Sequence, residues 1–122
     1  MKPSITTKQG DRGTTFLFSG EEISKASLRT HAYGDLDEVV SALGVARAAV
    51  QVQGLAEVIL EIQNELFVVA SELATACDHV HLLRDRMTPE SVARLDQIRE
   101  ETEASIVMPK TFILPGGTLA AA

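Results

Sequence analysis

Apolar side chains recur every three or four positions between Leu55 and Cys77, and this spacing constrains the fold more than any other feature. The step is close to the 3.5-residue repeat with which one helix packs against another in a bundle. A β-strand would need alternation at every second position. We therefore predict a long helix over this stretch with one apolar stripe, made of Leu55, Ile59, Ile62, Leu66, Val69, Leu73 and Ala76.

Two further stretches have helical spacing. One begins at Asp35 and ends before Gly54, and the other begins at Thr88-Pro89, an N-cap followed by proline at the first helical position, and ends at Pro109. After the turn at Pro115–Gly117 a helix could restart at Thr118. The chain therefore reads as an all-α helical bundle. The predicted inward stripes are Leu36, Val39, Val40, Leu43, Ala46 and Val50 in the first helix, and Val92, Leu95, Ile98, Thr102 and Ile106 in the last.

Charge is distributed unevenly along the predicted helices. Residues 48–78 contain no Lys or Arg. Their acidic face could simply be solvated, or it could meet basic side chains of the following segment or of another subunit, and we expect such a meeting. Asp35, Asp37 and Glu38 are predicted to lie in the first turn of their helix, where the macrodipole favours carboxylates. The acidic and basic sets are Glu57, Glu61, Glu65 and Glu72, and Arg84, Arg86, Arg94 and Arg99.

Composition excludes several classes of protein. A net charge of −6 argues against a general binder of nucleic acid or of anionic membranes. No apolar run approaches the 18–20 residues that span a bilayer, and no signal peptide opens the chain. The one cysteine, Cys77, cannot form an internal disulfide. We expect one domain over residues 1–122, in the cytoplasm.

The first thirty residues differ from the rest, because they carry a net charge of +2 and are rich in Gly, Ser and Thr. We predict a loop-like segment with one short strand around Thr14–Phe18. Within Thr7–Thr15, Gly10 and Gly13 permit positive φ or close backbone approach, so successive amides could form an anion-binding concavity. Lys8 and the threonine hydroxyls could add donors, and Asp11 could order the loop or help hold a divalent ion. Gly-Asp-x-Gly also makes ordinary turns.

Several familiar sites are absent from the sequence. It has no phosphate loop of the G-x-x-x-x-G-K-[ST] type, no H-E-x-x-H pair and no nucleophile elbow. Cys77, His79 and His81 alternate, as metal ligands on an extended segment would, but no fourth ligand is evident. We expect a loop with two exposed histidines there and assign no metal-ligating residue.

Five motifs together resemble those of the PduO-type ATP:cob(I)alamin adenosyltransferases. They occur in the family's order and spacing, and the resemblance covers nearly the whole chain. The motifs are Thr7–Thr15, Ser24-Lys25, Ala32–Glu38, Ile62–Phe67 and Phe112–Gly117.

The resemblance implies a five-helix bundle of the ferritin-like type, assembled as a homotrimer with active sites shared between subunits. The family transfers the 5′-deoxyadenosyl group of ATP to the cobalt of cob(I)alamin, with Mg²⁺ assisting, and releases triphosphate. Phe112 matches the aromatic that displaces the lower axial cobalt ligand, and Asp35 matches a residue that supports this geometry through a later Arg. The residues implied to bind ATP are Thr7, Lys8, Gln9, Gly10, Asp11, Gly13, Thr14, Thr15, Phe16 and Lys25.

The sequence also departs from the family pattern. The family continues beyond the Pro-Gly-Gly turn into a helix with an Arg-Arg-x-Glu-Arg cluster, whereas this sequence ends at Ala122, so we expect a C-terminally incomplete domain. Glu22 stands where the family often has Arg, and Val40 where it often has Asn. Two other functions stay open: a non-catalytic bundle that binds ATP or a corrinoid as carrier or sensor, and a purely structural oligomer.

Overall fold

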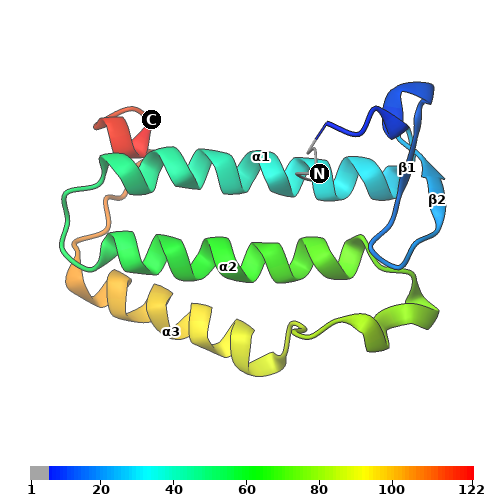
Figure 1. Ribbon diagram of the computed structural model, residues 1–122. Coiled ribbons are helices and arrows are strands. Elements are labelled where there is room, and N and C mark those ends of the chain that lie inside the picture. The colour runs from blue at the N-terminus through cyan, green and yellow to red at the C-terminus, as the bar shows by residue number, and fades with distance from the viewer. Residues whose placement is uncertain (1–5) are drawn as a thin grey trace.

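Two long antiparallel helices form the centre of the protein (Figure 1). In the computed structural model, which describes residues 6–122, α1 spans Leu28–Ala49 and α2 spans Leu55–Leu73. A third helix, α3 (Pro89–Ser105), runs along the other side of α2. The described residues are thus mostly helical, as predicted.

Helix α1 begins seven residues earlier than the apolar spacing indicates. Ser27 is its N-cap, with a hydroxyl that accepts a hydrogen bond from the Thr30 N–H at 3.2 Å. The three carboxylates at Asp35, Asp37 and Glu38 therefore lie in the middle of the helix, and the first turn holds no acidic residue. The predicted interaction of these carboxylates with the helix N-terminus is wrong, because the macrodipole acts within the first turn.

Helix α2 begins at the predicted position and ends earlier than predicted. Gly54 precedes it with φ 81°, and Ile59 and Gln63 are its buried residues. The Gln63 amide donates a 2.8 Å hydrogen bond to the Val40 carbonyl of α1, which fixes one helix against the other. The prediction that α2 continues to Cys77 is wrong: Thr75 lies beyond its end and is fully buried.

The end of α2 is held by a cation from α1. The Arg29 guanidinium donates to the carbonyls of Leu73 and Thr75, at 2.9 and 2.8 Å. These carbonyls have no partner within the helix, and an arginine satisfies them while opposing the negative end of the helix dipole.

The N-terminal segment contains a β-hairpin, so the loop-like description and the strict all-α class need correction. A short 3₁₀ helix, η1 (Gln9–Arg12), precedes β1 (Thr14–Phe16), which pairs antiparallel with β2 (Glu22–Ser24). The turn is anchored on the helices, because Leu17 is buried and the Phe18 N–H donates to the Ala74 carbonyl at 2.8 Å.

Helix α3 is tied to α2 through polar contacts. Arg94 pairs with Glu61 at 3.0 Å, and the Met87 N–H donates to the Glu72 carboxylate at 2.6 Å. The predicted meeting of the acidic face with a basic side chain is confirmed for Glu61. Arg99 instead pairs with acidic side chains close to it on α3.

The remaining segments are short or irregular. Cys77–Leu82 forms a 3₁₀ helix, η2, where a loop with two exposed histidines was predicted; His81 is exposed and His79 is partly buried. After α3 the chain is exposed up to another 3₁₀ turn, η3 (Leu119–Ala121), which packs against α1. The predicted helix restart is a single turn. Within residues 6–122, no helix has the length and apolarity needed to cross a membrane.

Candidate functional site

The N-terminal hairpin and the preceding 3₁₀ turn surround an open cavity of about 430 Å³. Five residues predicted to bind ATP line it, together with one further cation and one further carboxylate. The lining residues are Thr7, Lys8, Gln9, Arg12, Thr14, Phe16 and Glu22.

Two residues with left-handed backbone conformation bracket η1, beside this cavity. Lys8 has φ 59° and Gly13 has φ 85°; among residues 6–122, Lys8 is the only non-glycine residue with positive φ. The amides of Asp11 and Gly13 donate to the carbonyls of Lys8 and Gly10. These two amides are used within the loop, so the predicted anion-binding concavity has fewer free backbone donors than expected and depends more on side chains.

Gly10 gives Lys25 room to reach the loop. A Cβ at Gly10 would lie 2.6 Å from the Lys25 Nζ and 2.8 Å from its Cε, closer than side chains tolerate. The Lys25 backbone N–H also donates to the Gly13 carbonyl at 2.9 Å. Of the two properties predicted for these glycines, Gly13 has the positive φ, and Gly10 allows the close approach of the Lys25 side chain.

The strand alternation divides the remaining predicted residues. Thr14 and Phe16 lie on the cavity side of β1, so Thr15, which pairs with Ile23, lies on the opposite side. Asp11 is exposed and does not line the cavity.

The sequence reasoning missed Arg12 and Glu22 as site residues. Glu22 lines the cavity because it pairs with Phe16 across the hairpin. The sequence predicts only the first strand, so this pairing was not expected. Arg12 lies within the glycine-containing motif, so its position there was the available signal.

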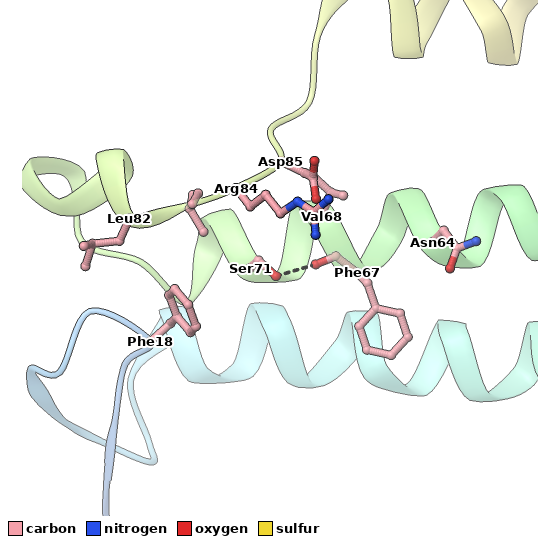
Figure 2. Close-up of a pocket in the computed structure, with 9 residues that line it drawn as sticks. Phe18, Asn64, Phe67, Val68, Ser71, Leu82, Arg84 and Asp85 are labelled. Carbon is pink, nitrogen blue, oxygen red and sulfur yellow. Dashed lines mark hydrogen bonds between the residues drawn. The ribbon is translucent and has the colours of Figure 1, made fainter.

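A second depression lies over α2, between the hairpin turn and the chain after η2 (Figure 2). Phe18 comes from the turn, Asn64 and Phe67 from α2, and Arg84 and Asp85 from the segment that leads to α3. Its volume is about 450 Å³. A smaller hollow of about 200 Å³ shares Phe18 and Phe67 with it and extends to α1. We call the two together the aromatic groove; it is lined by Phe18, Tyr33, Asp37, Asn64, Phe67, Val68, Ala70, Ser71, Ala74, Leu82, Leu83, Arg84 and Asp85.

Asp35 and Phe112 lie outside both cavities. Tyr33 and Asp37 face the groove from α1, and the 100° turn per residue places Asp35 about 160–200° away from both, on another face of the helix. Phe112 is fully exposed. Its segment follows α3 at the end of the helix pair opposite the hairpin (Figure 1). The structure therefore does not bring Phe112 and the N-terminal loop together within one chain.

The fold and site define a mostly helical protein whose N-terminal hairpin carries cationic and hydroxyl side chains around a cavity suited to an anionic ligand. Residues 5–122 match the family model described as cobalamin adenosyltransferase. The chain therefore belongs to the cobalamin adenosyltransferase family.

Relatives with known names support this assignment. A corrinoid adenosyltransferase of Citrobacter freundii is 37% identical over 118 residues, which cover 97% of this chain and 67% of that protein. Corrinoid adenosyltransferase PduO of Salmonella typhimurium is 33% identical over 113 residues, covering 93% of this chain and 34% of that protein. The chain thus spans about two thirds of the length of the first relative and about one third of the second.

A solved structure has the same fold. It is a phenylalanine-to-alanine variant of a PduO-type ATP:corrinoid adenosyltransferase from Lactobacillus reuteri, complexed with cobalamin and ATP. The TM-score is 0.85 at 29% sequence identity, over 96% of this chain and 66% of that chain.

Proposed function

We propose that this chain acts as an ATP:corrinoid adenosyltransferase. In the proposed reaction Co(I) of the reduced corrinoid attacks the ribose C5′ of ATP, the cobalt–carbon bond forms and the C5′–O bond breaks, leaving triphosphate. Because Co(I) supplies the electron pair, the protein needs no nucleophilic side chain. Its tasks are to align the two substrates and to stabilise the leaving anion.

The observation that carries this proposal is the contact between Lys25 and Gly10 beside the hairpin cavity. The segment after β2 thereby places an ammonium group against the glycine-containing loop, whose Lys8 and Arg12 line the cavity. Two cations at the cavity and a third held against the same loop suit a triphosphate, which gains negative charge when C5′ departs. Thr7, Gln9 and Thr14 add neutral donors, so the proposed ATP site is the hairpin cavity with Gly10, Asp11, Gly13, Thr15 and Lys25 in support.

The residues of the cavity also fit Mg²⁺, which prefers oxygen ligands and is commonly held by one or two carboxylates together with phosphates. Glu22 supplies a carboxylate at the cavity, and Thr7 and Thr14 supply hydroxyls. Bound there with the nucleotide, Mg²⁺ would neutralise charge on the phosphate oxygens.

Asp35 and Phe112 are proposed to act at the corrinoid. Both are exposed in one chain, and the segment between α3 and η3, which includes Phe112, lies at the end of the helix pair opposite the hairpin. A neighbouring chain could supply one part of a site and this chain the other, as expected for a homotrimer with shared sites. We propose this assembly, together with the five-helix ferritin-like bundle of the whole family domain and a cytoplasmic location.

The decisive experiment mixes the protein with ATP, Mg²⁺ and chemically reduced cobalamin, and follows cobalt–carbon bond formation by absorbance. Turnover supports the transferase. ATP binding without turnover would instead support the carrier or sensor, and absence of both would support a structural oligomer. Lys25→Ala should weaken ATP binding about tenfold or more in calorimetry and leave the fold intact, since one charge-assisted contact is lost. Unchanged affinity would remove Lys25 from the site.

Phe112→Ala separates cobalt chemistry from nucleotide binding. Because the ring is exposed, its removal should spare folding and ATP affinity. If the ring displaces the lower axial ligand, adenosylation should slow sharply from Co(II) and less from preformed Co(I), where no ligand needs displacement. Equal slowing from both starting states would contradict that role.

A further inference from the structure

Three potential metal ligands from two distant segments meet beside the hairpin turn. Nδ1 of His79 lies 2.9 Å from Oε1 of Glu21 and 3.0 Å from Oδ1 of Asp78. The ligand atoms of the three side chains all lie within 4.8 Å of one another. Glu21 follows β1, whereas Asp78 and His79 belong to η2, beyond the end of α2.

The Glu21 carboxylate is oriented by neighbours on its other side. Its Oε2 accepts a hydrogen bond from the Ser19 hydroxyl, and the Ser19 Oγ in turn accepts from the Ala76 N–H at 3.0 Å. These contacts lower the pKa of Glu21, chiefly through the Ser19 hydrogen bond and then through its own backbone N–H. Oε1 is left to face His79. A ligating carboxylate held in this way by a further hydrogen bond is typical of metal sites.

One hydrogen bond from His79 cannot satisfy both carboxylates that face its Nδ1. This nitrogen carries at most one hydrogen, so one of the two carboxylates is left beside the other without a hydrogen-bond donor between them. A cation between the three groups would satisfy all of them. In a tetrahedral zinc site with bonds near 2.1 Å the ligand atoms lie about 3.4 Å apart. The 3.0 Å separation of His79 and Asp78 reaches that value when the 80%-exposed Asp78 side chain rotates outward. The 2.9 Å separation of His79 and Glu21 reaches it with a shift of about 0.5 Å by these two partly exposed side chains.

We propose that Glu21, Asp78 and His79 form a binding site for one divalent cation of the Zn²⁺ type, with water completing its coordination. The imidazole ligand selects Zn²⁺ and similar transition metals over Mg²⁺, which prefers oxygen ligands. The ion would fasten the hairpin turn to the segment after α2. None of its ligands lines the hairpin cavity or the aromatic groove, so the site is independent of the proposed transferase function.

The test is a Zn²⁺ titration of the chelator-treated protein against a chromophoric competitor, together with thermal unfolding. We expect one bound Zn²⁺ per chain and a Tm increase of about 10 °C at a hundredfold excess over Kd, because the ion binds the folded state only. Mg²⁺ at the same concentration should not displace Zn²⁺. His79→Ala and Asp78→Asn should each lower the affinity at least about tenfold, and Ser19→Ala about tenfold through the lost orientation of Glu21.

The chain offers matched controls within the same 3₁₀ helix. Cys77→Ser and His81→Ala remove neighbouring ligand-type side chains that lie outside the cluster, and both variants should keep wild-type affinity. Lys25→Ala should also keep it, which separates this site from the ATP site. The proposal is overturned if the wild type shows no saturable binding, if His79→Ala binds as well as the wild type, or if His81→Ala or Cys77→Ser loses as much affinity as His79→Ala. Asp78 is mostly exposed, so Asp78→Asn tests the site even where a His79 variant is unstable.

Discussion

Gly10→Ala is the substitution that tests the proposed ATP site most directly. The new Cβ would lie 2.6 Å from the Lys25 Nζ, and an ordinary contact begins near 3.4 Å. The ammonium group must therefore move by about 0.8 Å, which lengthens a 2.9 Å hydrogen bond to a phosphate oxygen beyond hydrogen-bonding range. A lost charge-assisted hydrogen bond costs about 1.5–3 kcal/mol, or about 10- to 150-fold in the Kd for ATP.

The same substitution should leave the protein folded. The atoms it meets are the far end of a flexible side chain, and Gly10 does not have positive φ. We expect the free energy of unfolding to change by less than about 1 kcal/mol. Gly54→Ala is the matched control, because a Cβ there meets no atom within 4 Å but requires an unfavourable backbone at φ 81°, and the residue lies outside the proposed ATP site. It should lower Tm and affect ATP affinity much less.

Calorimetry on a double-mutant cycle decides whether the effect passes through Lys25. In the Lys25→Ala background, Gly10→Ala should cost no further ATP affinity, because the group that it displaces is already absent. Wild-type affinity in Gly10→Ala, or a loss that persists fully without Lys25, would refute the assignment of this contact to ATP binding.

Two further predictions concern exposed carboxylates. In Mg²⁺-free buffer Glu22→Gln should tighten ATP binding about two- to fivefold at low salt, because it removes a negative charge from the cavity lining, and about 0.5 M salt should reduce the effect. With Mg²⁺ present the gain should shrink or reverse, because Glu22 is the proposed carboxylate ligand of the ion. The same change at Glu57, outside that lining, should have no effect, and an unchanged affinity of Glu22→Gln in Mg²⁺-free buffer would place the phosphates elsewhere. The Glu90 carboxylate accepts hydrogen bonds from the Thr88 hydroxyl and from the Glu90 N–H, and both lower the pKa of Glu90. The stability that the ionised Glu90 contributes is therefore present above the ordinary pKa and is lost as pH falls. In Thr88→Ala an NMR titration should show that pKa moving up toward 4.5; no movement would contradict the assigned cause.

The helices were predictable where packing governs the sequence. Residues 55–73 carry an unbroken apolar spacing, and α2 begins at the predicted residue. The first turns of α1 contain Thr30, His31 and Gly34, which are weak helix formers, so the spacing signal starts only later. There the N-cap at Ser27 and the contacts of Arg29 with the end of α2 decide the structure.

The residues of the candidate site were predictable from sequence motifs, but their arrangement in space was predictable only in part. The glycine-containing loop and Lys25 followed from the resemblance, but the three-residue strand β2 has one apolar side chain, Ile23, and pairs with a strand six residues away. Such short strands leave no periodic pattern. Glu22 was therefore missed. The positions of Asp35 and Phe112 relative to a ligand cannot follow from one chain's sequence when neither lines the hairpin cavity or the aromatic groove.

One chain exposes more surface than a compact monomer of its mass. Its accessible area is 9730 Å², whereas a compact monomer of 13.1 kDa exposes about 6,400 Å². The difference of about 3,300 Å² is comparable to the area buried in obligate assemblies. Among residues 6–122 the buried apolar side chains are Leu17 and Ile59, while Leu28 and Val39 are exposed on the face of α1 that carries Asp35.

The proposed assembly predicts that stability depends on association. A chain with so small an apolar core would gain most of its burial from neighbours, so Tm should rise with protein concentration, by several degrees between about 1 and 100 μM, as mass action requires. Light scattering over the same range should report a trimer that persists in moderate salt, since burial of aliphatic surface outweighs the exposed ion pairs. Val39→Glu would place a charge on that face and should lower the Tm at high concentration toward its dilute value. A monomer with a concentration-independent Tm would contradict both the assembly and a site shared between chains.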